Sequence, residues 1–507
     1  MNVFFRVDAS LQTGSGHVMR CLALANAIRP FVSRAHFICR HLPDALEALL
    51  KANGHDVTRL PLGAPVVPEY ADPLAHEAWL GAPQAQDARD TLCVIGESDC
   101  DRLIVDHYAI DARWERLVRD KAKHILVIDD LADRAHVCDW LLDQNFHAGM
   151  ATRYLDLVPP NCARLLGPDY ALLRPEFLAL RQQIGPRSGT VRRILVFFGG
   201  MDAENYTRMA LDALQRAALT DVAVDVVIGA QHPDLEGIRA RCKALGYACH
   251  VQTTRMAELM AEADLCIGAG GTATWERCCL GLPTITFVVA DNQRDVVAAA
   301  AAAGLLLAPE VSAADPQALA EYLRDTMNQP ALLASISRTA FGAVHGMGVD
   351  RVRRAIGIFS VAMRRATASD AAIMYTWRNH EKIRSVSRSS APIEWEQHRA
   401  WVERVLSNPR QMLLIGSRQG VPVGVVRYDL DGIGTEAEIS IYLDPLINSR
   451  GLGSELLCAS ESYLRNGFVE VGAITAEVLD ENVASHRLFQ RNGYTRQGNI
   501  FIKKLLR

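Results

Sequence analysis

The chain has 507 residues, 49% of them hydrophobic and 22% charged, so we expect globular structure throughout and about three domains. Its formal net charge of −4 provides no basic field of the kind that neutralises phosphate backbones, which argues against a nucleic-acid partner.

Membrane insertion and secretion are not expected either. The longest apolar run, residues 296–309, is shorter than the roughly 20 residues that a membrane span needs. Arg6 and Asp8 interrupt the apolar amino terminus, which therefore predicts a buried first strand instead of a signal peptide. The twelve cysteines form no CxxC pair, so we expect reduced thiols in a cytoplasmic protein.

Residues 1–180 alternate short apolar runs with amphipathic stretches, a pattern typical of a parallel sheet wrapped by helices. Several runs end in Asp, His or Asn, where a parallel sheet presents its ligand-facing edge. These runs are NVFFRVD, RLIVDH, HILVIDD and WLLDQN, starting at residues 2, 102, 124 and 140. This domain is predicted to be Rossmann-like.

A glycine-containing loop precedes the first predicted helix. Gly14, Ser15 and Gly16 allow a tight turn, and amides at a helix start favour an anion. His17 follows at the mouth, where an imidazole with an ordinary pKa near 6.5 can take a proton from water. A helix-start residue without catalytic role is the alternative, because this motif alone is a weak signal.

A second series of strand-like runs follows a linker near residues 181–190 and predicts another Rossmann-like domain at 190–358. Gly199 and Gly200 follow its first strand and could bring amides to a pyrophosphate, or form only a tight turn. In CIGAGGTATWERCC, from residue 266, a strand ends in small residues and a helix carries Glu276 one turn in. We expect a cleft between the two halves.

The third predicted domain, residues 361–507, has mixed and largely antiparallel order. A Gly- and Ser-rich loop at residues 449–454 precedes a helix, so its amides could cradle a pyrophosphate. Glu438, at the start of the preceding strand, is a candidate base for an amine, acting directly or through water. An exposed strand carboxylate is the equal alternative.

Residues 1–350 resemble the UDP-2,4-diacetamido-2,4,6-trideoxy-β-L-altropyranose hydrolases of pseudaminic acid biosynthesis, through RVDAS, TGSGHVMRC, LIVDHY, VIDDLADR and LLGPDYALLRPEF. That family is similar in fold to GT-B glycosyltransferases but hands the sugar to water. The resemblance implies that His17 activates water at the anomeric carbon. Attack from the face opposite the leaving UDP predicts inversion, and no metal is expected because no Asp or Glu cluster with DxD spacing stands in a suitable loop. It also implies sugar contacts from Asp8, Arg20, Asp106, Tyr108 and Asn145, for which hydrogen bonds that hold loops are the alternative.

CIGAGGTATWERCC resembles the nucleotide-sugar signature of GT-B enzymes, which implies a UDP site on the second half. Its expected members are the phosphate-binding Gly199, Gly200, Gly271, Thr272 and Ala273, the ribose contact Glu276, and Asn292 and Gln293 near the nucleotide or sugar.

Residues 361–507 resemble GNAT acetyltransferases, through the loop before residue 454 and NVASHRLFQRNGY at 482–494. WRN at 377–379 is similar to the subgroup that acetylates UDP-4-amino-4,6-dideoxy-N-acetyl-β-L-altrosamine. Acetyl-CoA is the implied co-substrate, with contacts from Ile441, Leu443, Ser449, Arg450, Gly451, Leu452, Gly453, Ser454, Asn482 and Ser485. Two positions depart from the family: Asn448 replaces a Gln or Arg, and Phe489 replaces a proton-donating tyrosine, leaving Tyr494, His486 or water for that role.

Together the resemblances imply a bifunctional enzyme that first acetylates a UDP-amino sugar and then releases UDP. The alternatives are a UDP-sugar glycosyltransferase fused to a protein N-terminal acetyltransferase, and a non-catalytic nucleotide-sugar sensor. The exact sugar and the oligomeric state stay open.

Overall fold

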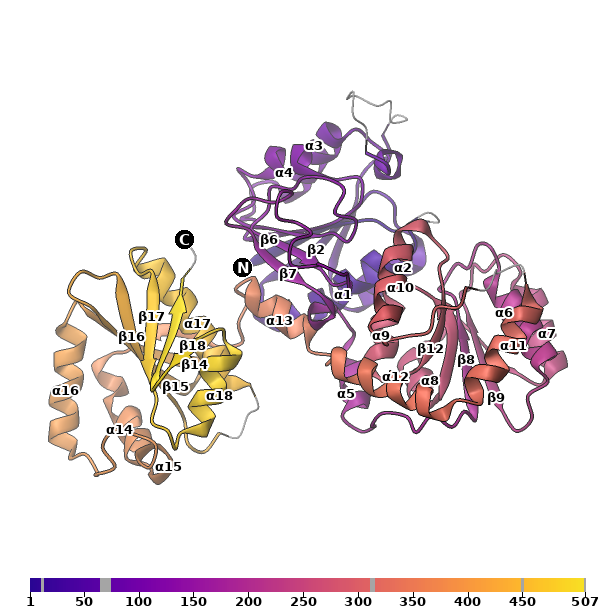
Figure 1. The fold of residues 1–507 in the computed structure, drawn as a ribbon. Helices are drawn as coiled ribbons and strands as arrows, with labels where there is room; N and C mark the ends of the chain where they lie inside the picture. The colour runs from indigo at the N-terminus through magenta and orange to yellow at the C-terminus, as the bar shows by residue number, and fades with distance from the viewer. Residues whose placement is uncertain (11–12, 64–73, 311–314, 448–450, 506–507) are drawn as a thin grey trace. The chain divides into compact units, whose positions relative to one another are not determined.

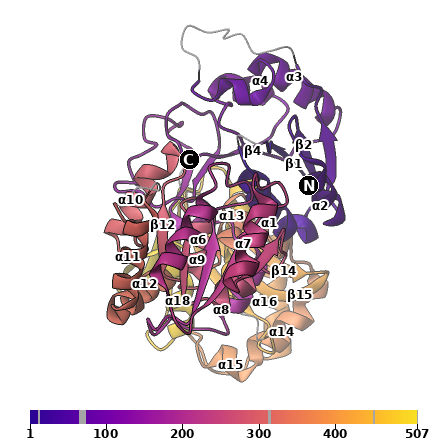
Figure 2. The same ribbon diagram turned by 90° about the vertical axis from the view of Figure 1, so that its right-hand side faces the viewer.

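The computed structural model describes residues 1–10, 13–63, 74–310, 315–447 and 451–505. The chain forms two compact units, residues 1–352 and 353–507. The first unit contains two parallel sheets with their helices, and the second contains one mixed sheet (Figures 1 and 2). The predicted α/β architecture, two Rossmann-like halves followed by a mixed α/β domain, is confirmed.

The first sheet has seven parallel strands in the order β3-β2-β1-β4-β5-β6-β7. The strands are β1 (Asn2–Val7), β2 (Arg34–Cys39), β3 (Asp56–Arg59), β4 (Arg102–Asp106), β5 (Ile125–Ile128), β6 (Trp140–Asp143) and β7 (Ala163–Leu166). Their helices are α1 (Gly16–Ile28), α2 (Asp44–Ala52), α3 (Gln84–Ile95) and α4 (Ala112–Val118). Strand order reverses between β1 and β4, and ligands of such sheets bind where the order reverses.

The second sheet repeats this logic with five parallel strands in the order β10-β9-β8-β11-β12. They are β8 (Arg193–Phe197), β9 (Ala223–Ile228), β10 (Ala248–Val251), β11 (Leu265–Ala269) and β12 (Thr284–Phe287). Here the order reverses between β8 and β11, so the loops after these two strands face the expected ligand position.

Helices cover both faces of the second sheet. They are α5 (Pro175–Arg181), α6 (Tyr206–Ala217), α7 (Leu235–Leu245), α8 (Met256–Glu262), α9 (Ala273–Cys279), α10 (Arg294–Ala302), α11 (Pro316–Met327) and α12 (Pro330–Ala343). A further helix, α13 (Gly348–Ala355), carries the boundary between the two units.

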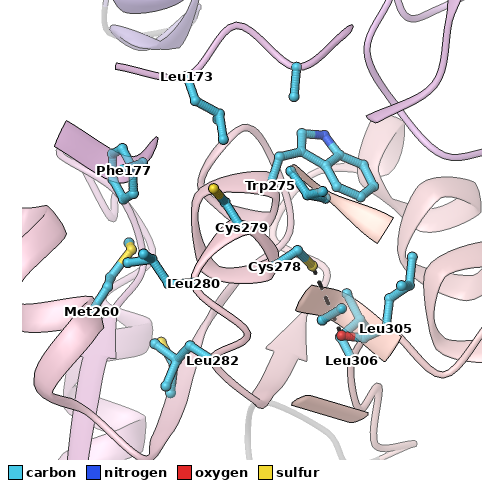
Figure 3. Packing of buried hydrophobic residues seen from close by; sticks show 14 of the residues in the cluster. Leu173, Phe177, Met260, Trp275, Cys278, Cys279, Leu280, Leu282, Leu305 and Leu306 are labelled. Carbon is cyan, nitrogen blue, oxygen red and sulfur yellow. Dashed lines mark hydrogen bonds between the residues drawn. The ribbon is translucent and has the colours of Figure 1, made fainter. Parts of the chain in front are cut away.

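The chain leaves the first sheet before residue 180 but already packs on the second half there. Leu173 and Phe177 belong to the same buried cluster as Trp275 and Cys279 (Figure 3). In the predicted linker, Arg187 donates to main-chain carbonyls of the second half, among them Met260 O at 2.8 Å. The boundaries near 180 and 190 stay predictions, and the structure adds that the linker is anchored by side chains.

The second unit has a seven-stranded sheet in the order β13-β14-β15-β16-β17-β19-β18. The strands are β13 (Ala362–Arg365), β14 (Gln411–Arg418), β15 (Val421–Leu430), β16 (Glu436–Leu443), β17 (Ala473–Glu477), β18 (Thr495–Gln497) and β19 (Ile500–Lys504). The helices are α14 (Ala371–Asn379), α15 (Glu381–Arg384), α16 (Trp395–Ser407), α17 (Leu452–Gly467) and α18 (Val483–Arg491).

Strands β16 and β17 form the parallel pair of this otherwise antiparallel sheet. Their register runs only from Glu436↔Ala473 to Glu438↔Thr475, although β16 continues to Leu443. The two strands therefore separate after Glu438, and the main chain of β16 beyond that point is released from β17. We call this place the fork.

Among the helices of the described residues, none combines the length and apolar character that crossing a membrane requires.

Candidate functional site

A cleft of about 1770 Å³ in the first unit is lined by loops at the carboxyl ends of strands in both sheets. It brings together most of the residues predicted for substrate binding in the two halves, while their roles stay predictions. Those lining it are Gly14, Ser15, Gly16, His17, Arg20, Tyr108, Gly199, Gly200, Gly271, Thr272, Ala273, Glu276, Asn292 and Gln293.

A smaller pocket of about 160 Å³, which we call the inner pocket, is lined from both halves. The first half contributes Thr13, Gly16, His17, Arg20, Tyr108, Asp130 and Asn145, and the second contributes Gly271, Thr272, Asn292, Gln293 and Val296. Predicted base, predicted sugar contacts and predicted nucleotide contacts thus share one polar space.

His17 is the second residue of α1 and is oriented by Asp106 at the end of β4. Its Nδ1 lies 2.5 Å from Asp106 Oδ1. Because an ionised carboxylate only accepts hydrogen bonds, this contact assigns the proton to Nδ1 and leaves Nε2 as the basic nitrogen. The imidazole also packs edge-on against Tyr108, with ring centroids 4.7 Å apart.

Arg20, one turn after His17 on α1, holds the same carboxylate in a two-pronged contact. Its Nε donates to Asp106 Oδ2 and its Nη2 to Oδ1, both at 2.7 Å. Burial alone would raise the pKa of Asp106, but the charges of Arg20 and His17 outweigh it and hold that pKa well below its usual range. Asp106 is therefore a fixed anion behind His17.

Asp8 lies beneath the cleft and not in its lining. Its Oδ1 accepts from Arg6 Nη1 at 2.6 Å and from the Arg40 main-chain N–H at 2.7 Å. His107 Nε2 lies 3.2 Å from Oδ2. These contacts are of the loop-holding kind that the sequence left as an alternative.

Asn145 joins the two halves. Its Oδ1 accepts from the indole N–H of Trp275 on α9 at 2.9 Å, and it borders the inner pocket. Trp275 is fully buried. This partner could not be predicted from the sequence, because 130 residues separate the two positions.

The second wall is built from the loops after β8 and β11. Gly199 has φ +102°, a conformation that a residue with a side chain rarely adopts, so the turn there needs glycine. Glu276, in the first turn of α9, faces Arg174, whose Nη2 lies 3.5 Å from Oε1. Burial raises the pKa of Glu276 while Arg174 opposes that rise. Arg174 belongs to the quoted LLRPEF motif but was not singled out from sequence.

Gln293 is the last residue of the short helix η4 (Asp291–Gln293), and Asn292 is its middle residue. The Gln293 Oε1 accepts from the Val289 N–H at 3.2 Å. This bond fixes the loop of residues 289–293, whose Asn292 and Gln293 line the inner pocket.

In the second unit, Glu438 lies at the fork, where β16 leaves β17. Its Oε1 accepts from Arg388 Nη2 at 2.8 Å, and the same guanidinium also contacts Glu477 on β17. Both carboxylates are about half exposed. Arg388 and Glu477 were missed from sequence, because only the fold brings them to Glu438.

Helix α17 begins directly after the predicted acetyl-CoA loop. Gly451, its N-cap, has φ +86°, which favours glycine, and Leu452, Gly453 and Ser454 form its first turn. Ile441 and Leu443 lie on β16 beyond the fork. Ser449, Arg450 and Asn448 lie outside the described residues.

The remaining acetyltransferase candidates lie on α18 or directly beside its two ends. Asn482 caps this helix by accepting from the Ser485 N–H at 3.0 Å. Tyr494 is buried, donates to Glu461 Oε1 at 2.8 Å, and has its pKa raised by burial and by Glu461. His486 Nε2 lies 3.1 Å from the Leu479 carbonyl oxygen. The Tyr494 hydroxyl is therefore hydrogen-bonded inside the core. A role of Tyr494 in proton transfer to the thiolate stays a prediction.

Within the residues that the structure describes, no three or more His, Cys, Asp or Glu side chains are grouped in a way that could hold a metal ion.

Two families match separate parts of the chain. Residues 193–347 match the glycosyltransferase family 28 C-terminal domain, and residues 360–495 match the acetyltransferase (GNAT) domain. The chain thus joins a segment similar to glycosyltransferase family 28 C-terminal domains to a segment similar to GNAT acetyltransferase domains.

Similar proteins include the UDP-2,4-diacetamido-2,4,6-trideoxy-β-L-altropyranose hydrolase of Campylobacter jejuni, 27% identical over 244 residues, which cover 48% of this chain and 75% of that protein. The spore coat polysaccharide biosynthesis protein SpsG of Bacillus subtilis is 30% identical over 189 residues, 37% of this chain and 56% of SpsG. An uncharacterized protein of Methanocaldococcus jannaschii is 22% identical over 508 residues, 97% of this chain and 96% of the relative.

Among solved structures, an aminoglycoside acetyltransferase in complex with coenzyme A is similar to this chain, with 20% identity and a TM-score of 0.26. The similarity covers 28% of this chain and 94% of that one.

Proposed function

We propose that the protein acts twice on a UDP-activated amino sugar. The GNAT domain transfers the acetyl group of acetyl-CoA to the 4-amine of UDP-4-amino-4,6-dideoxy-N-acetyl-β-L-altrosamine. The first unit then hydrolyses the UDP-diacetamido product to free sugar and UDP. The observation that carries the hydrolase assignment is the His17–Asp106 pair facing the glycine loops of the nucleotide-sugar domain, supported by the name of the Campylobacter relative.

The geometry supports the following course for the proposed hydrolysis. His17 Nε2 takes a proton from water as the water oxygen bonds to the anomeric carbon, and Asp106 stabilises the imidazolium that forms. The bond between the anomeric carbon and the β-phosphate oxygen breaks, and its electron pair leaves with UDP. Amides near Gly199, Gly200 and Thr272 stabilise the departing charge. Attack opposite to the leaving group inverts the anomeric centre.

Acetyl transfer is assigned to the fork of the second unit. The neutral 4-amine attacks the thioester carbonyl, and the C–S bond breaks to form the amide. The departing thiolate of coenzyme A receives the proton that the amine nitrogen loses, through a protein group or water. Glu438 at the fork removes the proton from the substrate ammonium, directly or through water. The α17 N-terminus offers amides to the coenzyme A pyrophosphate.

Isotope placement and two variants test the hydrolase step. The diacetamido UDP-sugar is incubated in ¹⁸O-water without any acceptor, and both products are analysed by mass spectrometry. We expect the label in the sugar and not in UDP, and roughly 100- to 10,000-fold slower release for His17→Ala and Asp106→Asn. Label in UDP, or full activity of His17→Ala, would contradict the mechanism.

A UDP-sugar glycosyltransferase is the second candidate, because the matched family of residues 193–347 is a glycosyltransferase domain. UDP release that starts only when an acceptor alcohol is added would favour it.

A further inference from the structure

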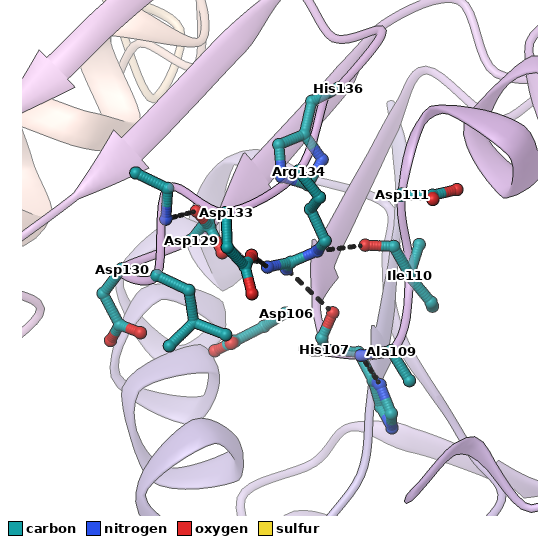
Figure 4. A network of polar contacts seen from close by, with 12 residues as sticks. Asp106, His107, Ala109, Ile110, Asp111, Asp129, Asp130, Asp133, Arg134 and His136 are labelled. Atoms are coloured by element: carbon teal, nitrogen blue, oxygen red, sulfur yellow. Dashed lines mark hydrogen bonds and ion pairs between the residues drawn. The ribbon is translucent and has the colours of Figure 1, made fainter. Parts of the chain in front are cut away.

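Asp130 lies at the centre of the ligand edge of the first sheet. It follows β5, and β5 lies between β4, which ends at Asp106, and β6, which leads to Asn145. Carboxyl ends of adjacent parallel strands meet at one edge, so the loop of Asp130 lies between two loops that face the inner pocket. Figure 4 shows Asp130 apart from the contacts that Arg134 makes with its neighbours.

The main chain around Asp130 is held from two sides. Arg153 Nη2 donates to the carbonyl oxygens of Asp130 and Leu131, each at 2.9 Å. Asp129 Oδ2 accepts from the Ala132 N–H at 2.9 Å. The position of the Asp130 side chain is therefore preorganised.

The two oxygens of Asp130 differ in the hydrogen bonds that they accept. Oδ2 accepts from Arg20 Nη1 at 3.1 Å. Oδ1 is buried and accepts no hydrogen bond of normal length and angle from the described residues, although the carboxylate interacts with the Tyr108 hydroxyl and borders the inner pocket. A buried carboxylate oxygen without such a hydrogen bond is costly, so the arrangement favours a ligand that supplies a donor.

The chemistry of that ligand follows from the charge of Asp130. An ionised carboxylate accepts hydrogen bonds and repels phosphate, so the pyrophosphate belongs with the glycine loops of the second half and the sugar with the inner pocket. The donors on a diacetamido sugar are its amide N–H groups and its hydroxyl.

We propose that Asp130 is a substrate-binding residue that accepts, through Oδ1, a hydrogen bond from an N–H or O–H group of the sugar in the inner pocket. This inference rests on the proposed hydrolase function and assigns one of its specificity contacts. Arg20 then links the two roles of the site, because it holds Asp106 behind the base and Asp130 beside the sugar.

Asp130→Asn and Asp130→Ala test the contact against Asp133→Asn as the control. Asp133 belongs to the same loop, is 45% exposed in its side chain and pairs with Arg134 outside the inner pocket. We expect the Asp130 variants to lose about 10- to 100-fold in kcat/KM for the diacetamido UDP-sugar, with an unchanged inhibition constant for UDP. Asp133→Asn should match the wild type in both values.

A 4-deoxy analogue, with hydrogen in place of the 4-acetamido group and therefore no donor at that carbon, identifies the donor. If Asp130→Asn no longer loses activity on this analogue, the partner is the 4-amide N–H; if the loss persists, it is the 2-amide N–H or the ring hydroxyl. Equal kcat/KM for wild type and Asp130→Asn on the diacetamido sugar, or a parallel weakening of UDP inhibition, would overturn the proposal.

Calorimetry separates this inference from the hydrolase assignment. Affinity for the diacetamido UDP-sugar is measured in a His17→Ala background, with and without Asp130→Asn, so that substrate is not consumed. If the wild-type protein binds the diacetamido UDP-sugar but releases no UDP, the hydrolase assignment is wrong, whereas the Asp130 contact is not affected. Equal affinities with and without Asp130→Asn contradict the Asp130 contact alone, and the affinity for UDP reports whether each variant keeps an intact cleft.

Discussion

At the residue scale, the first unit treats neighbouring carboxyl groups in opposite ways. Asp106 is buried but faces Arg20 and His17, so it stays ionised. Asp143, at the end of β6, is also buried, and burial together with the nearby Asp130 raises its pKa to about 7. One carboxyl serves as a fixed charge, whereas the other exchanges a proton near neutral pH.

Asp143 should make stability depend on pH. Between its ordinary pKa of 3.8 and about 7, the folded protein keeps a proton that the unfolded chain has lost. The free energy of unfolding therefore falls as pH rises through that window and levels off above it. The full shift corresponds to roughly 4 kcal/mol.

Asp143→Asn removes this titration and keeps one side-chain oxygen, which can still accept from the Asn145 N–H, while the amide nitrogen replaces the oxygen that accepts from the Tyr154 hydroxyl. We expect urea unfolding of the variant to vary less with pH between 4 and 7 than that of the wild type, and the variant to gain relative stability at pH 8. Parallel profiles for the two proteins would contradict the raised pKa. Asp99→Asn, at an exposed site, is the control.

At the element scale, sequence patterns predicted the strands and helix starts, because these depend on residues that are close together in the chain. Apolar runs ending in Asp or Asn predicted the strands of the first sheet, and the Gly-rich loop before His17 predicted the start of α1. Asp130 lies in a quoted run, HILVIDD, but nothing local distinguishes it from Asp129. Which carboxylate faces the inner pocket is decided by Arg20 and Arg153, which are distant in sequence.

At the fork, too, contacts between residues that are distant in the sequence could not be predicted. The order of β16, loop and α17 was predicted, and so was Glu438 at the start of β16. Its partners were not, because Arg388 and Glu477 lie 50 and 39 residues away and are joined only by the sheet and the loop that covers it. Tyr494 was predicted as a proton donor only because it lies close to Phe489 in the sequence. In the structure its hydroxyl donates to Glu461.

Glu438→Gln tests the fork as the site of acetyl transfer. Glu436, two residues earlier on the same strand and exposed, provides the control Glu436→Gln. We expect Glu438→Gln to lower kcat for acetylation of the UDP-amino sugar by about 100-fold or more, with little change in the KM for acetyl-CoA, while the control keeps wild-type kcat. Equal kcat for both variants would remove Glu438 from the mechanism.

At the scale of the whole molecule, the two compact units each carry one of the two proposed sites. The product proposed for the second unit is the substrate proposed for the first, and a covalent link raises the local concentration of that intermediate. The account therefore depends on an order of events, with acetylation before release of UDP.

The most direct measurement of that order starts from UDP-4-amino-4,6-dideoxy-N-acetyl-β-L-altrosamine and the purified full-length protein. UDP release and sugar mass are followed in time, with and without acetyl-CoA. The proposed order predicts that UDP appears only with acetyl-CoA, after an acetylated UDP-sugar, and that His17→Ala stops at this intermediate. UDP release at the same rate without acetyl-CoA, or no acetylated sugar at all, would contradict it.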